Sequence, residues 1–456
     1  MDEFISRLCS LQSAYVELLG RVPDWNGFLA QFGSPCQETH FADIIKMSEE
    51  YHLVNSAYLS IKAKLSPYEG FRRILLLGAY GNGNLGDRLM ADEVARIIEA
   101  DGKTICFAHS TLCSASYPFP PDRLLCADDI PLNRRVLSLF DAMVIGGGGL
   151  LSYPHEPIWD PSWPYLIPIP YGLFSCGVGV PLDSRLENLV RKAKVVSSRD
   201  MPGFQELYAR RTDALLCPDP VMSFGDLEAI EIDPSRGRLF VLRAPFCDWH
   251  RRLKQRLHAK DAVVVFEAHM DHEISSYFNN VQAVNTSDDF RALARDFRVI
   301  VSERFHGAIL ALLADVPVWG LHRKPHAEKF VSLFEDLGIS SHLVDLDDAG
   351  YEFAPYEMQP VRLRLKAIRE GAVAHYQKFV KQLFASDPDA SKPSAAPPRQ
   401  ALDVTGASIE VSNRLTVARE IHDSAMAALL INEGTLDLAA RAATVDHFTA
   451  QIREPR

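Results

Sequence analysis

The sequence predicts an α/β fold made of two doubly wound, Rossmann-like domains. Short apolar segments typical of buried strands alternate with helical segments between residues 72 and 224, and they alternate again between residues 239 and 385. The pattern lapses between Phe224 and Arg238, where glycine, proline and serine replace the apolar runs, and we expect a domain boundary there. Alternation of this kind favours parallel sheets that helices cover on both faces.

Five segments follow from this pattern. The first, residues 1–66, carries apolar side chains spaced for one stripe on a helix, namely Phe4, Leu8, Leu11, Tyr15 and Leu18. The two Rossmann-like domains then span residues 67–230 and 231–385. Residues 386–406 are rich in alanine, proline and serine and predict a flexible linker, and residues 407–456 predict a second helical extension.

The composition is that of a soluble globular protein. Of the 456 residues, 47% are hydrophobic and 23% are charged, and the net charge of −11 argues against a nucleic-acid partner. The sequence has neither a long apolar run nor the pattern of a secretory signal, and its eight cysteines form no Cys-x-x-Cys pair. We therefore predict a cytoplasmic protein. The cluster His269-Met-Asp-His272 is short and has no distant partner, so we expect no metal site.

A strand-to-helix junction carries the residues with the clearest chemistry. The run Val299–Val301 predicts a buried strand and Ala308–Ala314 predicts a helix, and Arg304 and His306 lie between them. Both side chains would then stand at the carboxyl edge of a parallel sheet, where ligands bind and helix N-termini favour anions. Arginine suits phosphate or carboxylate, and histidine can move a proton near neutral pH. The alternative is a surface arginine and a core histidine without a functional role.

The segment Gly81–Gly86 matches the pattern Gly-x-Gly-x-x-Gly between a predicted strand and a predicted helix. A dinucleotide site is not favoured, because the second strand does not end in an acidic residue and Asp87 would crowd a pyrophosphate. A P-loop is not favoured either, because the Gly-Lys-Ser/Thr element is missing. The glycines, Gly86 among them, still allow a ligand near the backbone, where Asn84 can form hydrogen bonds and Asp87 can accept a proton. Alternatively, Asp87 only caps its helix.

Two further strand ends carry glycine or arginine. The run Gly146–Gly149 follows a buried strand, so that Gly147 and Gly148 predict either a backbone wall beside a ligand or an ordinary turn. Arg199 follows another strand, where it would line the same edge or pair with a nearby charge. Residues 152–170 are rich in proline, tryptophan and tyrosine, which is typical of an ordered loop over a site.

Together these stretches resemble the polysaccharide pyruvyltransferase family. The resemblance covers about residues 72–340 and rests on six motifs in order: Gly-Asn-Leu-Gly-Asp (83–87), the glycine run (146–149), Gly-Val-Gly-Val (177–180), Ser-Arg-Asp (198–200), Pro-Asp-Pro (218–220) and Arg-Phe-His-Gly-Ala-Ile-Leu-Ala (304–311). The family usually has leucine where this chain has Phe305. A lysine ahead of Phe334 and Leu337 also belongs to the pattern, and Lys324 and Lys329 both fit it.

The resemblance implies a GT-B-like arrangement with the site between the two domains. It implies transfer of pyruvate from phosphoenolpyruvate to sugar hydroxyls as a ketal during surface or exopolysaccharide biosynthesis, without a cofactor or a metal. The acceptor would be a sugar or a lipid-linked oligosaccharide, and peripheral membrane association and a homo-oligomer are left open. His306 would be the acid or phosphate partner and Asp87 the base. The residues that would bind substrate are Asn84, Gly86, Gly147, Gly148, Arg199, Arg304 and Lys329, and the aromatic loop Tyr153–Tyr171 would stack against the acceptor.

Two other functions fit the same architecture. A nucleotide-sugar glycosyltransferase would use Arg304 to hold a pyrophosphate. A catalytically idle relative would serve as a binding or assembly module through its terminal helices, although the presence of Asp87, Arg199, Arg304 and His306 weighs against that reading.

Overall fold

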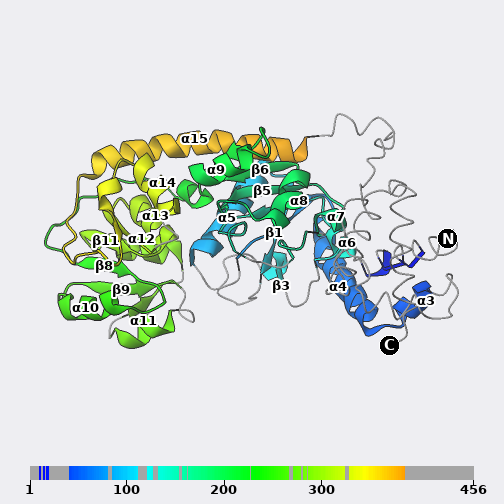
Figure 1. Cartoon of the computed structure of the whole chain (residues 1–456), viewed down its shortest axis with the longest axis horizontal. Coiled ribbons are helices and arrows are strands. Elements are labelled where there is room, and N and C mark those ends of the chain that lie inside the picture. Colours follow the sequence, from blue (N-terminus) through cyan, green and yellow to red (C-terminus); the bar gives the residue numbers. More distant parts are fainter. Residues whose placement is uncertain are drawn as a thin grey trace, which may run out of the picture.

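The computed structural model contains two parallel sheets, one in each half of the chain (Figure 1). It describes residues 10–11, 14–15, 17–19, 41–80, 85–110, 121–126, 132–153, 157–161, 163–225, 227–266, 271–278, 281–284, 286–323 and 328–385. Among these residues, the seven-stranded sheet has the order β3-β2-β1-β4-β5-β6-β7 and the six-stranded sheet has the order β10-β9-β8-β11-β12-β13. These are the orders of doubly wound sheets, and they confirm the predicted fold class.

The first Rossmann-like domain buries both faces of its sheet. Its strands are β1 (Arg72–Leu77), β2 (Thr104–Ser110), β3 (Leu124–Cys126), β4 (Ala142–Gly146), β5 (Tyr171–Cys176), β6 (Val195–Ser198) and β7 (Leu215–Leu216). Its helices are α5 (Leu85–Ile98), α6 (Arg134–Leu137), α7 (Trp163–Leu166), α8 (Glu187–Lys192), α9 (Met201–Tyr208) and the 3₁₀ helix η7 (Pro220–Ser223). In β1, Ile74 and Leu76 belong to one core while Leu75 and Leu77 belong to another. A strand that alternates in this way must be covered on both sides.

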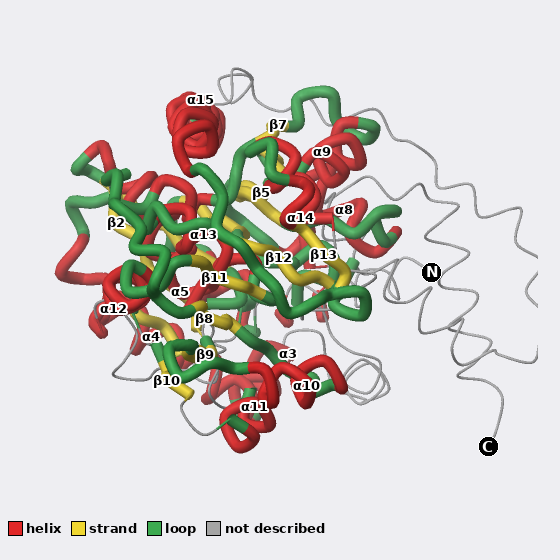
Figure 2. Tube along the Cα trace, turned by 90° about the vertical axis from the view of Figure 1, so that its left-hand side faces the viewer, coloured by secondary structure: helices red, strands yellow, loops and turns green. Residues whose placement is uncertain are grey.

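The second domain repeats this construction. Its strands are β8 (Arg238–Val241), β9 (Ala262–Val265), β10 (Val281–Ala283), β11 (Val299–Ser302), β12 (Val318–His322) and β13 (Leu343–Asp345). Its helices are α10 (Asp248–Arg256), α11 (His272–Tyr277), α12 (Ser287–Ala294), α13 (Phe305–Leu313) and α14 (Glu328–Asp336). Figure 2 shows α10 and α11 on one side of the sheet and α13 and α14 on the other. Accordingly, Val299 and Val301 share a core with Trp249 of α10, whereas Ile300 shares one with Ile309 of α13.

Helices precede the first sheet, in agreement with the predicted N-terminal extension. They are α3 (Phe41–Lys46) and α4 (Glu49–Leu65), and Asn55 of α4 accepts a hydrogen bond from Arg135 at 2.7 Å. The described residues between η7 and β8 form neither helix nor strand. Residues 386–406 and 407–456 lie outside the described residues, and the five predicted boundaries stay predictions. None of the described helices is long and apolar enough to cross a membrane.

The long helix α15 (Met358–Phe384) runs along both domains (Figure 1). Near its start, Arg362 pairs with Asp315 of the second domain at 2.6 Å. Near its end, the Phe379 ring packs on Phe174 of β5 with ring centres 4.5 Å apart, and Arg72 of β1 lies 4.2 Å from the centre of the Phe384 ring. The helix therefore ties the two domains together.

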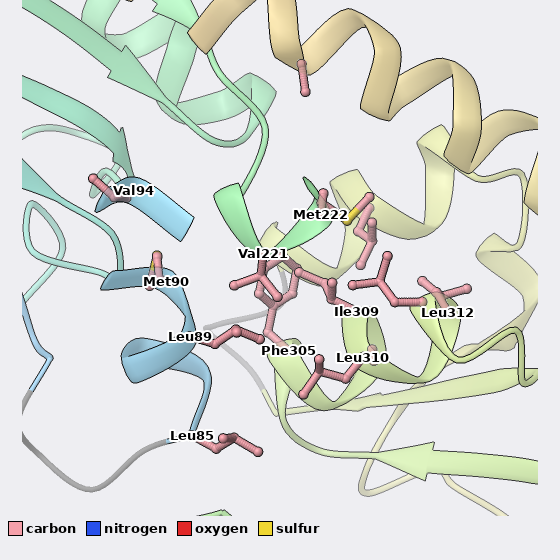
Figure 3. Close-up of a cluster of buried hydrophobic side chains, with 14 of the residues drawn as sticks. Leu85, Leu89, Met90, Val94, Val221, Met222, Phe305, Ile309, Leu310 and Leu312 are labelled. Carbon is pink, nitrogen blue, oxygen red and sulfur yellow. The ribbon is translucent and has the colours of Figure 1, made fainter. Parts of the chain in front are cut away.

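A shared hydrophobic cluster joins the domains beneath the starts of α5 and α13. Figure 3 draws it with side chains from α5, η7 and α13, namely Leu85, Leu89, Met90, Val221, Met222, Phe305 and Ile309. Because α5 and α13 both begin at this interface, the residues of their first turns come close to one another across it.

Candidate active site

The junction between β11 and α13 carries Arg304 and His306. Arg304 is the N-cap of α13 and has an extended backbone, and its N–H donates to Ser302 Oγ at 3.1 Å. The Ser302 hydroxyl donates in turn to the Arg304 carbonyl at 2.7 Å, which closes a tight turn. A Cβ at Gly307 would overlap that hydroxyl, so glycine is needed there. The predicted strand-to-helix junction is present, and its helix begins at Phe305.

One buried carboxylate joins His306 of the second domain to Arg199 of the first. His306 Nε2 lies 3.3 Å from Asp219 Oδ2, and Arg199 Nη1 donates to the same oxygen at 3.0 Å. Asp219 Oδ1 accepts the N–H of Val221 at 3.1 Å, which fixes the carboxylate at the start of η7. The three side chains are only 3–9% exposed. Asp219 belongs to the Pro-Asp-Pro motif, but nothing in that motif predicts this role.

The partners of Asp219 keep it ionised. Burial alone would raise its pKa, because an ionised carboxylate loses the stabilisation that water gives it. His306, followed by Arg199 and the N–H of Val221, outweighs burial and holds the pKa of Asp219 well below its usual range. The ionised carboxylate orients the His306 ring, which turns Nε2 towards Asp219 and Nδ1 towards Gly86.

The N-terminus of α5 meets His306 at Gly86. A Cβ on Gly86 would overlap His306 Nδ1, so this contact requires glycine. Asp87 follows directly and is 8% exposed, and its Oδ1 would lie 3.7 Å from a Cβ at Gly148. The structure therefore brings Gly86 against His306 and Gly148 against Asp87. Asn84 lies outside the described residues.

The glycine run forms a tight turn after β4. Gly147 and Gly148 have φ values of 75° and 68°, in the left-handed region that favours glycine. The N–H of Gly148 donates to Met90 Sδ at 3.3 Å, and its carbonyl accepts the N–H of Gly177 at 2.8 Å. A Cβ at Gly147 would overlap the Met90 side chain. Gly148 thus faces Asp87, and the side of Gly147 where a Cβ would stand is filled by Met90; the role of Gly147 in binding substrate stays a prediction.

Two cations lie over the Phe305 ring. The guanidinium carbon of Arg199 is 5.2 Å from the ring centre and Lys329 Nζ is 5.6 Å from it. At such distances the ring attracts both charges. Lys329 is half-buried on α14, and Lys324, the other lysine that fits the family pattern, lies outside the described residues.

The surroundings of Lys329 weaken its hold on a proton. Removal from water is the largest effect and lowers the pKa of Lys329 to about 7. The charged groups that act on it besides are Arg199, Arg243, Asp87 and Arg304, of which only Asp87 raises the pKa. An amine with this pKa gains or loses its charge near neutrality.

Arg304 is paired with a buried carboxylate as well. Its Nη2 donates to both oxygens of Asp271, at 2.8 Å and 2.6 Å, and the N–H of Ala244 donates to Oδ1 at 2.8 Å. Asp271 lies within the sequence cluster 269–272 that resembles a metal motif, and residues 269–270 fall outside the described part of the chain. Across the described residues, no group of three or more His, Cys, Asp or Glu is arranged to hold a metal ion. The spacing of residues in the sequence does not predict that Asp271 pairs with Arg304.

The aromatic loop is mostly part of the first domain's core, which corrects our expectation that it stacks against an acceptor. Trp159 and Trp163 are 7% and 2% exposed, and their indole N–H groups donate to backbone carbonyls at 3.0 Å. Tyr171 is buried in β5. Of the loop's ends, only Tyr153 stays exposed, at 46%, where it lies against Gly149.

A pocket opens between the domains beside this cluster. It encloses about 620 Å³, part of it open to solvent, and its charged lining consists of Arg199, Lys329, Asp200, Asp219 and Asp336. Most of the other lining side chains are apolar, among them Met222, Phe305, Ile309, Leu333 and Ile368. Apolar walls with a few charged groups are typical of small-molecule sites.

The sequence matches a known protein family. The profile described as polysaccharide pyruvyl transferase matches residues 84–325, more than half of the chain. The chain belongs to the polysaccharide pyruvyl transferase family. It is therefore a transferase, and the family implies a sugar or polysaccharide acceptor. No curated protein sequence matches the chain.

Solved structures resemble this family member in fold only. They include Staphylococcus aureus MnaA with UDP (11% identity, 69% of this chain and 93% of that chain, TM-score 0.41) and UDP-GlcNAc 2-epimerase from Neisseria meningitidis bound to UDP-GlcNAc (11%, 69% and 95%, TM-score 0.37). The glycosyltransferase SnogD from Streptomyces nogalater is similar at the same level (12%, 69% and 100%, TM-score 0.39). Likeness this low carries no information on substrate.

Proposed function

We propose that this transferase moves pyruvate from phosphoenolpyruvate to two hydroxyls of a sugar or lipid-linked oligosaccharide as a ketal, in surface or exopolysaccharide biosynthesis. The observation that carries the proposal is the Asp219 carboxylate, which contacts His306 and Arg199 across the domain interface. A group that can move a proton thus stands beside a group that binds anions, and Asp87 follows Gly86, which lies against the His306 ring. Transfer from phosphoenolpyruvate needs both kinds of group, and no cofactor besides the donor.

The cations of the site suit the two anionic groups of the donor. Phosphoenolpyruvate carries a phosphate and a carboxylate, and Arg199, Arg304 and Lys329 belong to one electrostatic cluster. Each arginine is already held by a buried carboxylate, Asp219 or Asp271. The chain as a whole carries a net charge of −11, so the anionic donor relies on this local positive field.

The proposed reaction consists of two additions to the same carbon. The first sugar hydroxyl adds to the enol carbon that bears the phosphate; Asp87 takes the hydroxyl proton and His306 gives a proton to the CH₂ carbon, which becomes a methyl group. The bond between that carbon and the phosphate oxygen then breaks, and phosphate leaves with the electron pair and takes the proton from Asp87. The Asp87 carboxylate, ionised again, stabilises the resulting cationic carbon. The second hydroxyl attacks that carbon and its proton passes to His306, which restores both side chains. One ketal and one phosphate result.

Phosphate release tests the proposal. We expect release from phosphoenolpyruvate only when a sugar acceptor is present, and protection from thermal unfolding by phosphoenolpyruvate but not by a UDP-sugar. Arg199→Ala and Arg304→Ala should weaken donor binding, whereas His306→Ala should lower turnover by about 10²–10⁴-fold. Arg362→Ala breaks an Arg–Asp pair outside the site and serves as the matched control. Wild-type rates in all three site variants would refute the assignment, and protection by a UDP-sugar alone would favour a nucleotide-sugar glycosyltransferase.

A further inference from the structure

Asp271 occupies a helix N-cap without capping its helix. It precedes α11, where an aspartate usually accepts an N–H from the first turn of its own helix. Within the described residues of α11 its side chain accepts no such bond. The carboxylate turns instead to Nη2 of Arg304 and the N–H of Ala244, and its side chain is fully buried. The Asp271 side chain therefore binds groups at the neighbouring strand ends and does not cap the helix that follows it.

A second buried carboxylate, Glu303, holds the same strand ends. It accepts the N–H of Arg243 at 3.1 Å and is bound by Arg323 Nη2 at 2.8 Å. Two consecutive amides after β8, those of Arg243 and Ala244, are thus bound by two different buried carboxylates. Backbone held at successive N–H groups has little freedom to shift, so Asp271 is anchored on one side while it binds Arg304 on the other.

We propose that Asp271 is a positioning residue, which holds the guanidinium of Arg304 in the orientation that binds the donor. The inference rests on the donor-binding role proposed above for Arg304. An arginine that must be ordered on binding loses side-chain freedom, whereas one that is held beforehand does not. Without Asp271, Arg304 keeps its charge and loses the two hydrogen bonds that orient its Nη2.

The sign of the effect separates positioning from simple charge balance. Asp271→Asn removes a negative charge beside the anion site. If Asp271 were only a counter-charge, its loss would raise the local positive potential and strengthen the binding of anions. A positioning role predicts the opposite, because the amide binds the guanidinium less strongly than the carboxylate does. We expect roughly ten- to hundredfold weaker binding, the range for one hydrogen bond to a charged group.

Titration calorimetry with phosphoenolpyruvate, and separately with inorganic phosphate, measures this effect on the full chain. The matched control is Asp261→Asn, which breaks another buried Arg–Asp pair of the same domain, with Arg238 at 2.6 Å, before the start of β9. Asp261→Asn should lower the unfolding temperature and leave anion affinity unchanged. Asp271→Asn should weaken anion binding, raise the KM for phosphoenolpyruvate and leave kcat nearly unchanged.

The double variant Arg304→Ala/Asp271→Asn should bind no more weakly than Arg304→Ala, because the carboxylate acts through the arginine. Equal or tighter binding by Asp271→Asn, or additive losses in the double variant, would overturn the inference. Asp271→Ser, which also removes the carboxylate, replaces Asp271→Asn should the latter not fold. Wild-type protein that binds phosphate but not phosphoenolpyruvate would refute the proposed function while the phosphate series still tests Asp271. Wild-type protein that binds neither would refute both.

Discussion

Lys329 should make donor affinity fall as the pH rises above 7. The free protein holds the pKa of Lys329 at about 7, and a bound anion favours the charged amine and raises that pKa, so the donor binds together with a proton. If Lys329 stays protonated in the complex, the apparent dissociation constant scales with 1 + 10^(pH − 7). The constant then rises about fivefold from pH 7 to pH 8 and about fiftyfold from pH 7 to pH 9. The donor's phosphate, with a pKa of about 6, is almost fully ionised throughout and adds little to this change.

The assay is the KM for phosphoenolpyruvate between pH 7 and pH 9, with calorimetric affinity measured alongside. Lys329→Arg keeps a charge at every pH in this range and should flatten the profile while binding stays tight. Lys329→Met should also flatten it, with weak binding throughout. A wild-type profile that is flat, or one as steep in Lys329→Arg as in the wild type, would refute the reasoning.

Three further predictions follow from the packing around the site. Gly86→Ala should reduce turnover by about 100-fold, because the added methyl group displaces the His306 imidazole, although alanine normally stabilises a helix. The control is Gly371→Ala on α15, which has open space around it and should stabilise the fold by up to about 1 kcal/mol. Equal activity of the two variants would contradict the contact between Gly86 and His306. Asp219→Asn should lower kcat by about 10²–10⁴-fold, whereas Asp315→Asn should change only the unfolding temperature. Phe379→Ala should lower the free energy of unfolding by about 3–5 kcal/mol in urea titrations, and a loss below 1 kcal/mol would show that α15 does not tie the domains.

The fold class was predictable because strand and helix periods are local properties of the chain. Ile74 to Leu77 and Val299 to Val301 are apolar at every position, which is what strands covered on both faces require. Arg304 and His306 could be found for a related reason, because the turn that presents them lies between a strand and a helix that are both visible in the sequence.

The residues that complete the site depend on contacts between distant parts of the chain. Asp219 acts through a histidine 87 positions away, and Asp271 acts through an arginine 33 positions away, so neither distance leaves a periodic signal. The prediction that the aromatic loop stacks against an acceptor was wrong for another reason. Its composition is the same whether tryptophans face a ligand or the core, and only the backbone carbonyls that accept from Trp159 and Trp163 decide for the core.

The helix α15 connects the site to both domains. The hydroxyl of Tyr376 lies 2.9 Å from the carbonyl of Pro218 and 3.2 Å from that of Asp219, and Ser175 donates to the Pro218 carbonyl from β5 at 3.1 Å. The loop that carries Asp219 is therefore held from the first domain's sheet and from a helix that starts on the second domain. His306 binds the same carboxylate from the second domain. A change in the distance between the domains therefore moves the groups that hold Asp219, namely Tyr376 of α15 and His306 of α13. The position of this carboxylate depends on both domains and on the helix that joins them.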